Sequence, residues 1–130
     1  MKNFIYTLVD YIDKLELEYP VKVGIFDENP SLMVRPVTGS EVIHEYMNGM
    51  TDIRLPFEVS IKSKDQEVAF NVLNEVMNHI RDIGKFLNDE KDGNELILLN
   101  LELDQIPVFG ASEDGYFYYT SKLTVDLTNG

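Results

Sequence analysis

The stretch Ile53-Arg-Leu-Pro-Phe-Glu-Val-Ser-Ile-Lys62 alternates apolar and polar side chains over ten residues. Successive side chains of a β-strand point to opposite faces of the sheet, so this period of two predicts a strand with one buried and one polar face. Such a strand is typical of an antiparallel or mixed sheet that is covered on one side. Pro56 has no N–H to donate, so we expect this strand to lie at a sheet edge or to carry a bulge there.

Two segments with helical periodicity flank this strand. In the first, apolar residues recur at helical spacing before Tyr19-Pro20, which ends the helix because a residue before proline avoids the helical region. The second is predicted to begin after Asp65 as N-cap, with Glu67 at the positive end of the helix dipole. The first apolar stripe consists of Ile5, Leu8, Val9, Ile12 and Leu15, and the second of Ala69, Leu73, Val76, Met77, Ile80, Ile83 and Leu87.

The remaining apolar segments predict further strands. We expect short strands at residues 21–25, 32–35 and 40–46, each bounded by turn-forming residues. The nearly continuous apolar run 96–103 predicts a central strand, whereas 105–112 is expected to be a connection. A tight turn, Glu113-Asp114-Gly115, precedes a last strand over 116–127. The side chains expected on one face of that strand are Phe117, Tyr119, Leu123, Val125 and Leu127.

This order of elements predicts an α+β fold: a mostly antiparallel sheet with two helices packed on one face. No repeat, low-complexity tract or linker divides the 130 residues, which is a common length for one domain. We therefore expect residues 1–130 to form a single domain.

The chain carries 23 acidic and 11 basic residues, a formal net charge of −12. Such a chain repels phosphate, which argues against sequence-specific nucleic-acid binding and against association with anionic membranes. No apolar run approaches the roughly 18 residues needed to span a bilayer, and the N-terminus resembles no targeting peptide. We expect a soluble protein made in the cytoplasm.

Residues that carry catalytic or metal chemistry are sparse. The sequence has no cysteine, and its histidines, His44 and His79, stand alone rather than at metal-ligand spacing. The acidic loop 88–95 fails as a calcium loop, because the closing glutamate position is occupied by Leu99. Serine-nucleophile and glycine-rich phosphate motifs are absent from the sequence. We therefore expect no catalytic residues, no metal and no cofactor, and hence a protein that is not an enzyme.

Three segments together resemble the tail terminator proteins of siphophages, which are often labelled minor capsid proteins. The first runs from Leu32-Met-Val-Arg-Pro-Val-Thr-Gly39 to Glu45-Tyr-Met-Asn-Gly49, and the second from Phe57-Glu-Val-Ser-Ile61 through Lys64-Asp-Gln66 into the helix after it. The third comprises Ile106-Pro-Val-Phe109 and Glu113-Asp-Gly-Tyr-Phe-Tyr-Tyr119. The resemblance extends over nearly the whole chain.

The resemblance implies an α+β subunit of a homo-oligomeric ring, usually hexameric. Such a ring caps the tail tube and joins it to the head-completion protein, so the expected partners are other copies of the chain and those two proteins. The resemblance also implies assembly in the host cytoplasm of a phage or prophage, then residence at the head–tail junction of the virion. It carries over no catalytic residue.

A ring subunit needs exposed edges or loops that add to a neighbour's surface. Tyrosine and methionine are enriched in such contacts, although tyrosines are also common as half-buried strand residues. The candidate contact residues lie in two predicted loops or turns: Tyr46, Met47 and Met50 in one, and Tyr116, Tyr118 and Tyr119 in the other.

Two further functions remain open from the sequence. The charge of −12 would suit an acidic DNA mimic that inhibits a host DNA-binding protein, although the acids are scattered over both helices and every loop. A small hydrolase or ligand-binding domain is the third hypothesis, because carboxylates are plentiful, and a pocket with a shifted carboxylate pKa would support it.

Overall fold

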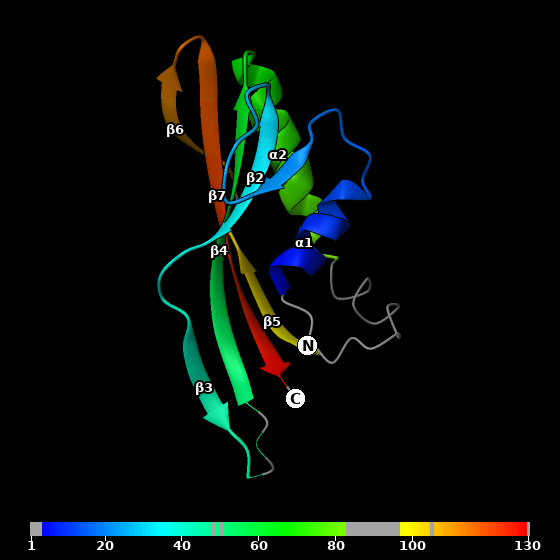
Figure 1. Ribbon diagram of the computed structural model, residues 1–130, viewed down its shortest axis with the longest axis vertical. Coiled ribbons are helices and arrows are strands. Elements are labelled where there is room, and N and C mark those ends of the chain that lie inside the picture. The colour runs from blue at the N-terminus through cyan, green and yellow to red at the C-terminus, as the bar shows by residue number, and fades with distance from the viewer. Residues whose placement is uncertain (1–3, 48, 50, 83–96, 105, 130) are drawn as a thin grey trace.

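The computed structural model describes residues 4–47, 49, 51–82, 97–104 and 106–129. In chain order these form α1 (Phe4–Asp13), β1 (Val21–Val23), β2 (Ser31–Pro36), β3 (Glu41–Glu45), β4 (Thr51–Ser63), α2 (Gln66–Ile80), β5 (Ile97–Leu103), β6 (Val108–Glu113) and β7 (Tyr116–Asn129). The described strands make a seven-stranded sheet in which only β1 and β2 pair in parallel. The predicted α+β fold is confirmed (Figure 1).

Two long strands, β4 and β7, run antiparallel through the centre of this sheet. Their register is unbroken from the pair Thr51–Asn129 to the pair Ser63–Phe117. Each long strand is flanked on its outer side by two short strands placed one after the other. β2 and β3 pair with successive parts of β4, and β6 and β5 pair with successive parts of β7.

The prediction that Pro56 marks an edge or a bulge is wrong, because β4 is a central strand and its ladder with β7 is regular. The carbonyl oxygen of Pro56 accepts a hydrogen bond from the Val37 N–H at 3.1 Å. The nitrogen of a strand residue points to the same side as its carbonyl, which here is the gap between β2 and β3. No residue of β2 or β3 pairs with Pro56 in the ladders, so the proline interrupts neither of them.

Two predictions for the segment after residue 95 are also wrong. The run 96–103 was expected to be a central strand, but β5 lies at the end of the strand order, and its Leu99 is exposed. Residues 105–112 were expected to be a connection, but 108–113 form β6, which pairs with β7 through a register shift between Phe109 and Ala111. The shift lies at Gly110, where a bulge accommodates the residue that interrupted the strand pattern.

The predicted turn Glu113-Asp114-Gly115 joins β6 to β7. Glu113 pairs with Tyr116, and both residues between them have positive φ, 53° at Asp114 and 79° at Gly115. Two positive φ values are typical of a type I′ turn, whose twist matches that of a β-hairpin, and Asp-Gly is a favoured pair for it.

Both helices cover the same face of the sheet. α1 ends at Asp13, before the predicted limit, because the next residues form tighter turns and Glu16 adopts a left-handed conformation with φ of 55°. α2 begins as predicted, and the Asp65 carboxylate accepts a hydrogen bond from the Val68 N–H at 3.1 Å. Two predicted residues of its stripe, Ile83 and Leu87, lie outside the described residues.

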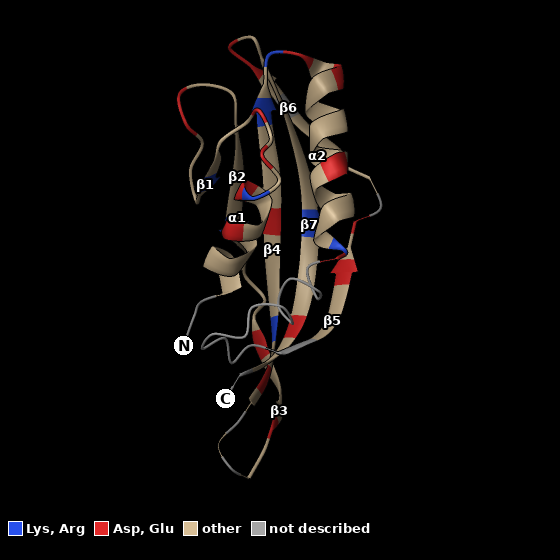
Figure 2. Cartoon of the chain, turned by 90° about the vertical axis from the view of Figure 1, so that its right-hand side faces the viewer, with Lys and Arg blue, Asp and Glu red and all other residues tan. Residues whose placement is uncertain are grey.

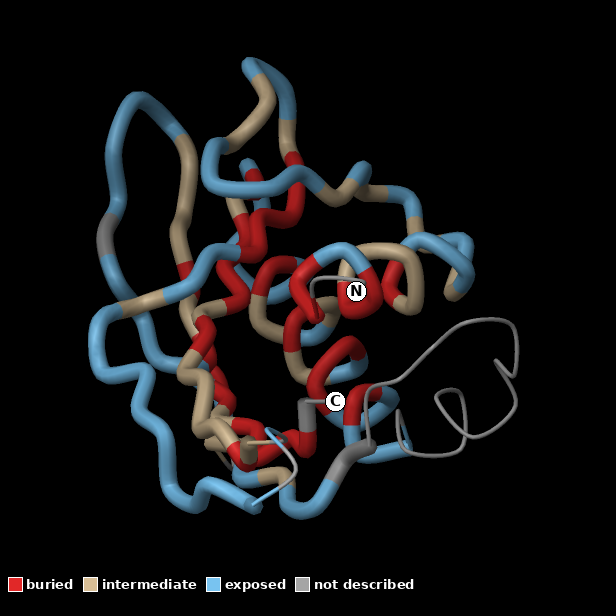
Figure 3. Tube along the Cα trace, turned by 60° about the horizontal axis from the view of Figure 1, so that its bottom comes forward, coloured by how far each residue is buried: buried red, intermediate tan, exposed pale blue. Residues whose placement is uncertain are grey.

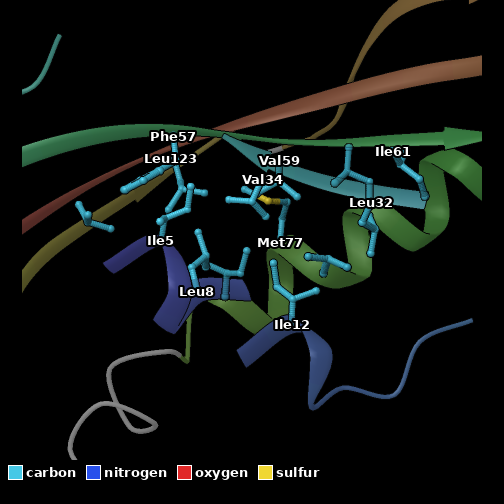
Figure 4. Close-up of a cluster of buried hydrophobic side chains, with 14 of the residues drawn as sticks. Ile5, Leu8, Ile12, Leu32, Val34, Phe57, Val59, Ile61, Met77 and Leu123 are labelled. Atoms are coloured by element: carbon cyan, nitrogen blue, oxygen red, sulfur yellow. The ribbon is translucent and has the colours of Figure 1, made fainter. Parts of the chain in front are cut away.

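The core lies between these helices and the strands β2, β4 and β7 (Figure 4). Its fully buried side chains alternate along each strand and recur at helical spacing in α1 and α2. The largest of them are Phe4, Leu8, Ile12, Leu32, Ile61, Leu73, Ile80, Leu123 and Leu127. Figure 3 shows the buried segments gathered inside, with exposed segments around them.

Candidate protein-interaction surfaces

Two β-hairpins project at opposite ends of the central strands. The hairpin of β3 and β4, residues 41–55, is here called the arm, and it extends from the lower end of the sheet in Figure 1. The hairpin of β6 and β7, residues 108–120, is called the turn end and lies at the upper end. They lie at opposite ends because β4 and β7 are antiparallel, so that Thr51 pairs with Asn129 and Ser63 with Phe117.

One side of the arm exposes apolar side chains. Val42 pairs with Ile53, whose side chain points to the same face of the sheet as the helix-covered residues of β4. Val42 is 56% exposed, and with the partly buried Ile53 and Leu55 it lines an open hollow of about 220 Å³. A desolvated contact with another protein would bury these side chains.

The other side of the arm is fixed by hydrogen bonds to Asp52. Its carboxylate is buried and accepts from the Thr128 hydroxyl at 2.6 Å and from the Tyr46 hydroxyl at 2.8 Å. The bond to the carboxylate raises the pKa of Tyr46. The aromatic ring of Tyr46 meets that of His44 edge to face, with centroids 4.4 Å apart. Asp52 therefore joins the loop after β3 to the end of β7.

A second polar cluster lies one step along the same face. The Arg54 guanidinium binds the Asp126 carboxylate through two hydrogen bonds, at 2.8 and 3.1 Å, and reaches Glu41 in β3 at 3.2 Å. The hydrogen bonds from Arg54 lower the pKa of Asp126, and the same bonds raise that of Arg54. This cluster ties β3, β4 and β7 together where no helix covers them.

The turn end carries the predicted tyrosines in three different settings. The ring of Tyr116 is half-buried beneath the ammonium of Lys62, whose Nζ lies 4.5 Å from the ring centroid. Tyr118 packs edge to face on Phe26 at 5.5 Å, and its pKa is raised mainly by burial. Tyr119 belongs to the core and is only 8% exposed.

The sequence-predicted contact residues therefore fall into two separate groups. Tyr46 and Met47 are exposed at the arm, Tyr116 and Tyr118 are half-buried at the turn end, and Met50 lies outside the described residues. Tyr119 is a core residue whose ring packs on Phe70 and Phe109, so it offers little surface to a partner.

Sequence reasoning missed several exposed apolar residues near these groups. Val108 is 60% exposed and Phe109 is 48% exposed in β6, and Val42 and Ile43 are exposed in β3. The sequence feature that could have indicated these exposed residues is a short apolar pair close to glycine or proline, as in Val42-Ile43 and Val108-Phe109. A short edge strand carries too few residues for its period to reveal which side chains are covered.

The described residues contain no group of three or more side chains suited to hold a metal ion. His79 lies 3.9 Å from Glu75 one helical turn away, and its backbone carbonyl accepts a hydrogen bond from Tyr11. Among those residues, no helix is long and apolar enough to cross a membrane.

A sequence model of a protein family described as bacteriophage tail terminator protein matches residues 11–129. The match extends from α1 to the last residue of β7 and includes both hairpins. The chain belongs to the bacteriophage tail terminator family. No curated protein matches it. As a tail terminator the chain is a structural protein of the phage tail, and the resemblance to that family seen in the sequence is confirmed.

Proposed function

We propose that this tail terminator is the subunit of a homo-oligomeric ring, a hexamer, that caps the tail tube and joins it to the head-completion protein. The family match carries the proposal as far as a structural role in the phage tail. Assembly in the host cytoplasm of a phage or prophage, followed by incorporation at the head–tail junction, belongs to the same proposal, as does the label of minor capsid protein.

The arrangement of the two hairpins supports a ring. A head-to-tail contact joins two different surfaces, and it produces a closed ring when the rotation between subunits closes. The arm and the turn end are different surfaces, each with exposed apolar side chains, at opposite ends of the sheet. The proposed contact residues are Tyr46, Met47 and Met50 of one and Tyr116 and Tyr118 of the other.

The distribution of charge argues against the second candidate, an acidic inhibitor that mimics DNA. A mimic needs carboxylates spaced like phosphates along one face. Figure 2 shows acidic residues spread over both helices, several strands and the connecting loops. Three of them, Glu41, Glu58 and Asp126, are also paired with arginines. Competition with DNA for a basic host protein would support this function.

The ring is tested by measuring the mass of the purified chain at several concentrations, with negative-stain imaging of the same samples. The proposal expects a species of six 14.9 kDa chains, and added tail tubes should carry it at their ends. A strictly monomeric chain that never binds tube ends would contradict the proposal.

A matched pair of variants tests whether the arm takes part. Met47→Ser removes a fully exposed apolar side chain of the arm, and Tyr6→Ser removes a 59% exposed aromatic side chain from α1. We expect Met47→Ser to reduce ring formation and Tyr6→Ser to leave it unchanged. Equal effects of the two variants would remove the arm from the interface.

A further inference from the structure

Four described strands leave one backbone edge without a partner strand among the described residues. β1 pairs only with β2, β3 only with β4, and β5 and β6 only with β7. An open edge offers a row of N–H and C=O groups that can pair with a strand of another chain. Which strand each edge accepts depends on its side chains.

The β3 edge is acidic. Its sequence, Glu41-Val-Ile-His-Glu45, places a carboxylate at each end of an apolar pair. Pairing of two β3 strands would bring four carboxylates together with no lysine or arginine in either strand, and like charges close to one another destabilise a sheet. The β5 and β6 strands each carry an acid as well, Glu102 and Glu113. The β3 edge therefore disfavours itself and both of these edges.

The β1 edge has the complementary character. Its sequence, Val21-Lys-Val23, has one basic residue and no acid, Lys22 is exposed, and Val23 is 39% exposed. No ion pair joins Lys22 to any residue that the structure describes. Of the four open edges, β1 is the one whose charge attracts β3.

The faces of the two strands also agree. Glu41 pairs with Arg54, on the face of the sheet turned away from the helices, and Lys22 lies on that face as well, beside Met33 and in line with Ser60. Val21 and Val23 pair with the core residues Leu32 and Val34 on the helix side, where Val42 also points. Side chains that lie opposite each other on neighbouring strands point to the same face of the sheet. A register that places Lys22 beside Glu41 therefore also places a valine of β1 beside Val42 on the helix side.

The twist of the sheet separates β2, which carries β1, from β3. In the upper half of Figure 1, β2 lies to the right of β4, and β1 follows β2 in the strand order. At the lower end, β3 lies to the left of β4, although both β2 and β3 belong to the same side of that strand. A head-to-tail contact joins two different surfaces, and the β1 and β3 edges belong to different parts of the sheet.

We infer that β3 of one subunit pairs with β1 of the next, with Lys22 beside Glu41 across the contact, so that the sheet continues from copy to copy. This inference rests on the proposed ring, and it places β1 rather than the turn end against β3 of the arm. The occupant of the β3 edge is a second copy of this chain, because β1 supplies a basic residue and apolar side chains for an acidic strand whose Val42 and Ile43 are exposed.

A charge swap tests the pairing. Lys22→Glu and Glu41→Lys, each alone, place like charges together, and we expect each to weaken assembly by about tenfold in dissociation constant. The double variant Lys22→Glu/Glu41→Lys restores an attractive pair, because the carboxylate introduced in β1 meets both the ammonium introduced in β3 and the neighbouring Arg54. Its assembly should therefore return to near that of the wild type. Masses measured over a concentration series provide the readout.

Lys122→Glu is the matched control, because Lys122 is an exposed lysine of β7 that belongs to neither edge, and it should assemble like the wild type. Single variants that assemble normally, or a double variant without rescue, overturn the pairing while the ring stands. A wild-type chain that does not assemble overturns both.

Amide hydrogen exchange provides a second test, and it uses the wild-type chain, so that no substitution can affect folding. Assembly should slow amide exchange in residues 21–23 and 41–45, because backbone pairing protects those N–H groups. Unchanged exchange in both strands on assembly overturns the pairing.

Discussion

Strand β4 passes through two regions that differ in what fixes them. In its second half, Phe57, Val59 and Ile61 are buried beneath α1 and α2. In its first half, Ile53 and Leu55 are only partly buried, β3 beside them is exposed, and hydrogen bonds to Asp52 and Asp126 hold the strands. Burial stabilises the covered half, whereas polar contacts position the arm and leave its apolar side chains available. The covered half therefore supplies most of the burial, whereas the exposed apolar side chains of the arm are the ones that the proposed contacts would use.

The largest expected effect is a cavity in the covered half. Leu73→Ala in α2 removes a fully buried side chain, and we expect it to lower the free energy of unfolding by about 2–5 kcal/mol. Urea denaturation followed by circular dichroism measures the change. A loss below about 1 kcal/mol would contradict the close packing of α2 on this half of the sheet.

Removing the carboxylate that braces the arm should have a smaller effect. Asp52→Ala leaves the Thr128 and Tyr46 hydroxyls without their acceptor, and we expect a loss of about 1–3 kcal/mol with faster amide exchange in β3. Asp13→Ala, at an exposed position of α1, is the control and should be neutral. If exchange in β3 is unchanged, Asp52 does not position the arm.

The start of α2 tests the covered half at its boundary. Asp65→Ala removes the side chain that accepts from the Val68 N–H, and N-cap losses of this kind cost about 1 kcal/mol. Thermal unfolding would show the loss, while Asp65→Asn, which retains an acceptor oxygen, should largely keep the stability. Similar losses in both variants would contradict a capping role.

Acid should weaken the arm's polar contacts selectively. The pKa of Asp126 is lower in the folded chain than in the unfolded chain, so its stabilising contribution is present above the unfolded pKa and is lost as pH falls through the folded pKa. We expect urea midpoints between about pH 6 and pH 2.5 to fall less steeply in Asp126→Asn than in the wild type. Identical pH profiles would show that Arg54 does not stabilise the ionised form.

The buried side chains of the covered half were well predicted from the sequence, because the apolar pattern of a long helix or strand indicates which of its side chains are buried. The alternation from Ile53 to Lys62 and the stripe of α2 each fixed an element and its inner face. Edge positions were less predictable. Pro56 is tolerated in a central strand because its nitrogen faces the gap between β2 and β3, and no local sequence pattern reveals such a gap. The apolar run of β5 likewise forms an edge strand.

The candidate contacts were predictable only in part. Tyrosines near the turn predicted the region around β6 and β7, yet Tyr119 is in the core, because its position in β7 points toward the helices. The residue type alone does not separate a half-buried tyrosine from an interface tyrosine. The exposure of Val42 and Val108 became visible only once neighbouring strands were in place.

The central claim is that the exposed apolar side chains of the arm mediate the proposed assembly without contributing to the stability of the subunit. Val42→Asp tests it most directly, because Val42 is 56% exposed on the apolar side of the arm. Native mass spectrometry of this variant, beside a thermal unfolding curve, should show monomers at concentrations where the wild type forms rings, with an unfolding temperature close to that of the wild type. Rings that form as readily as those of the wild type would contradict the claim.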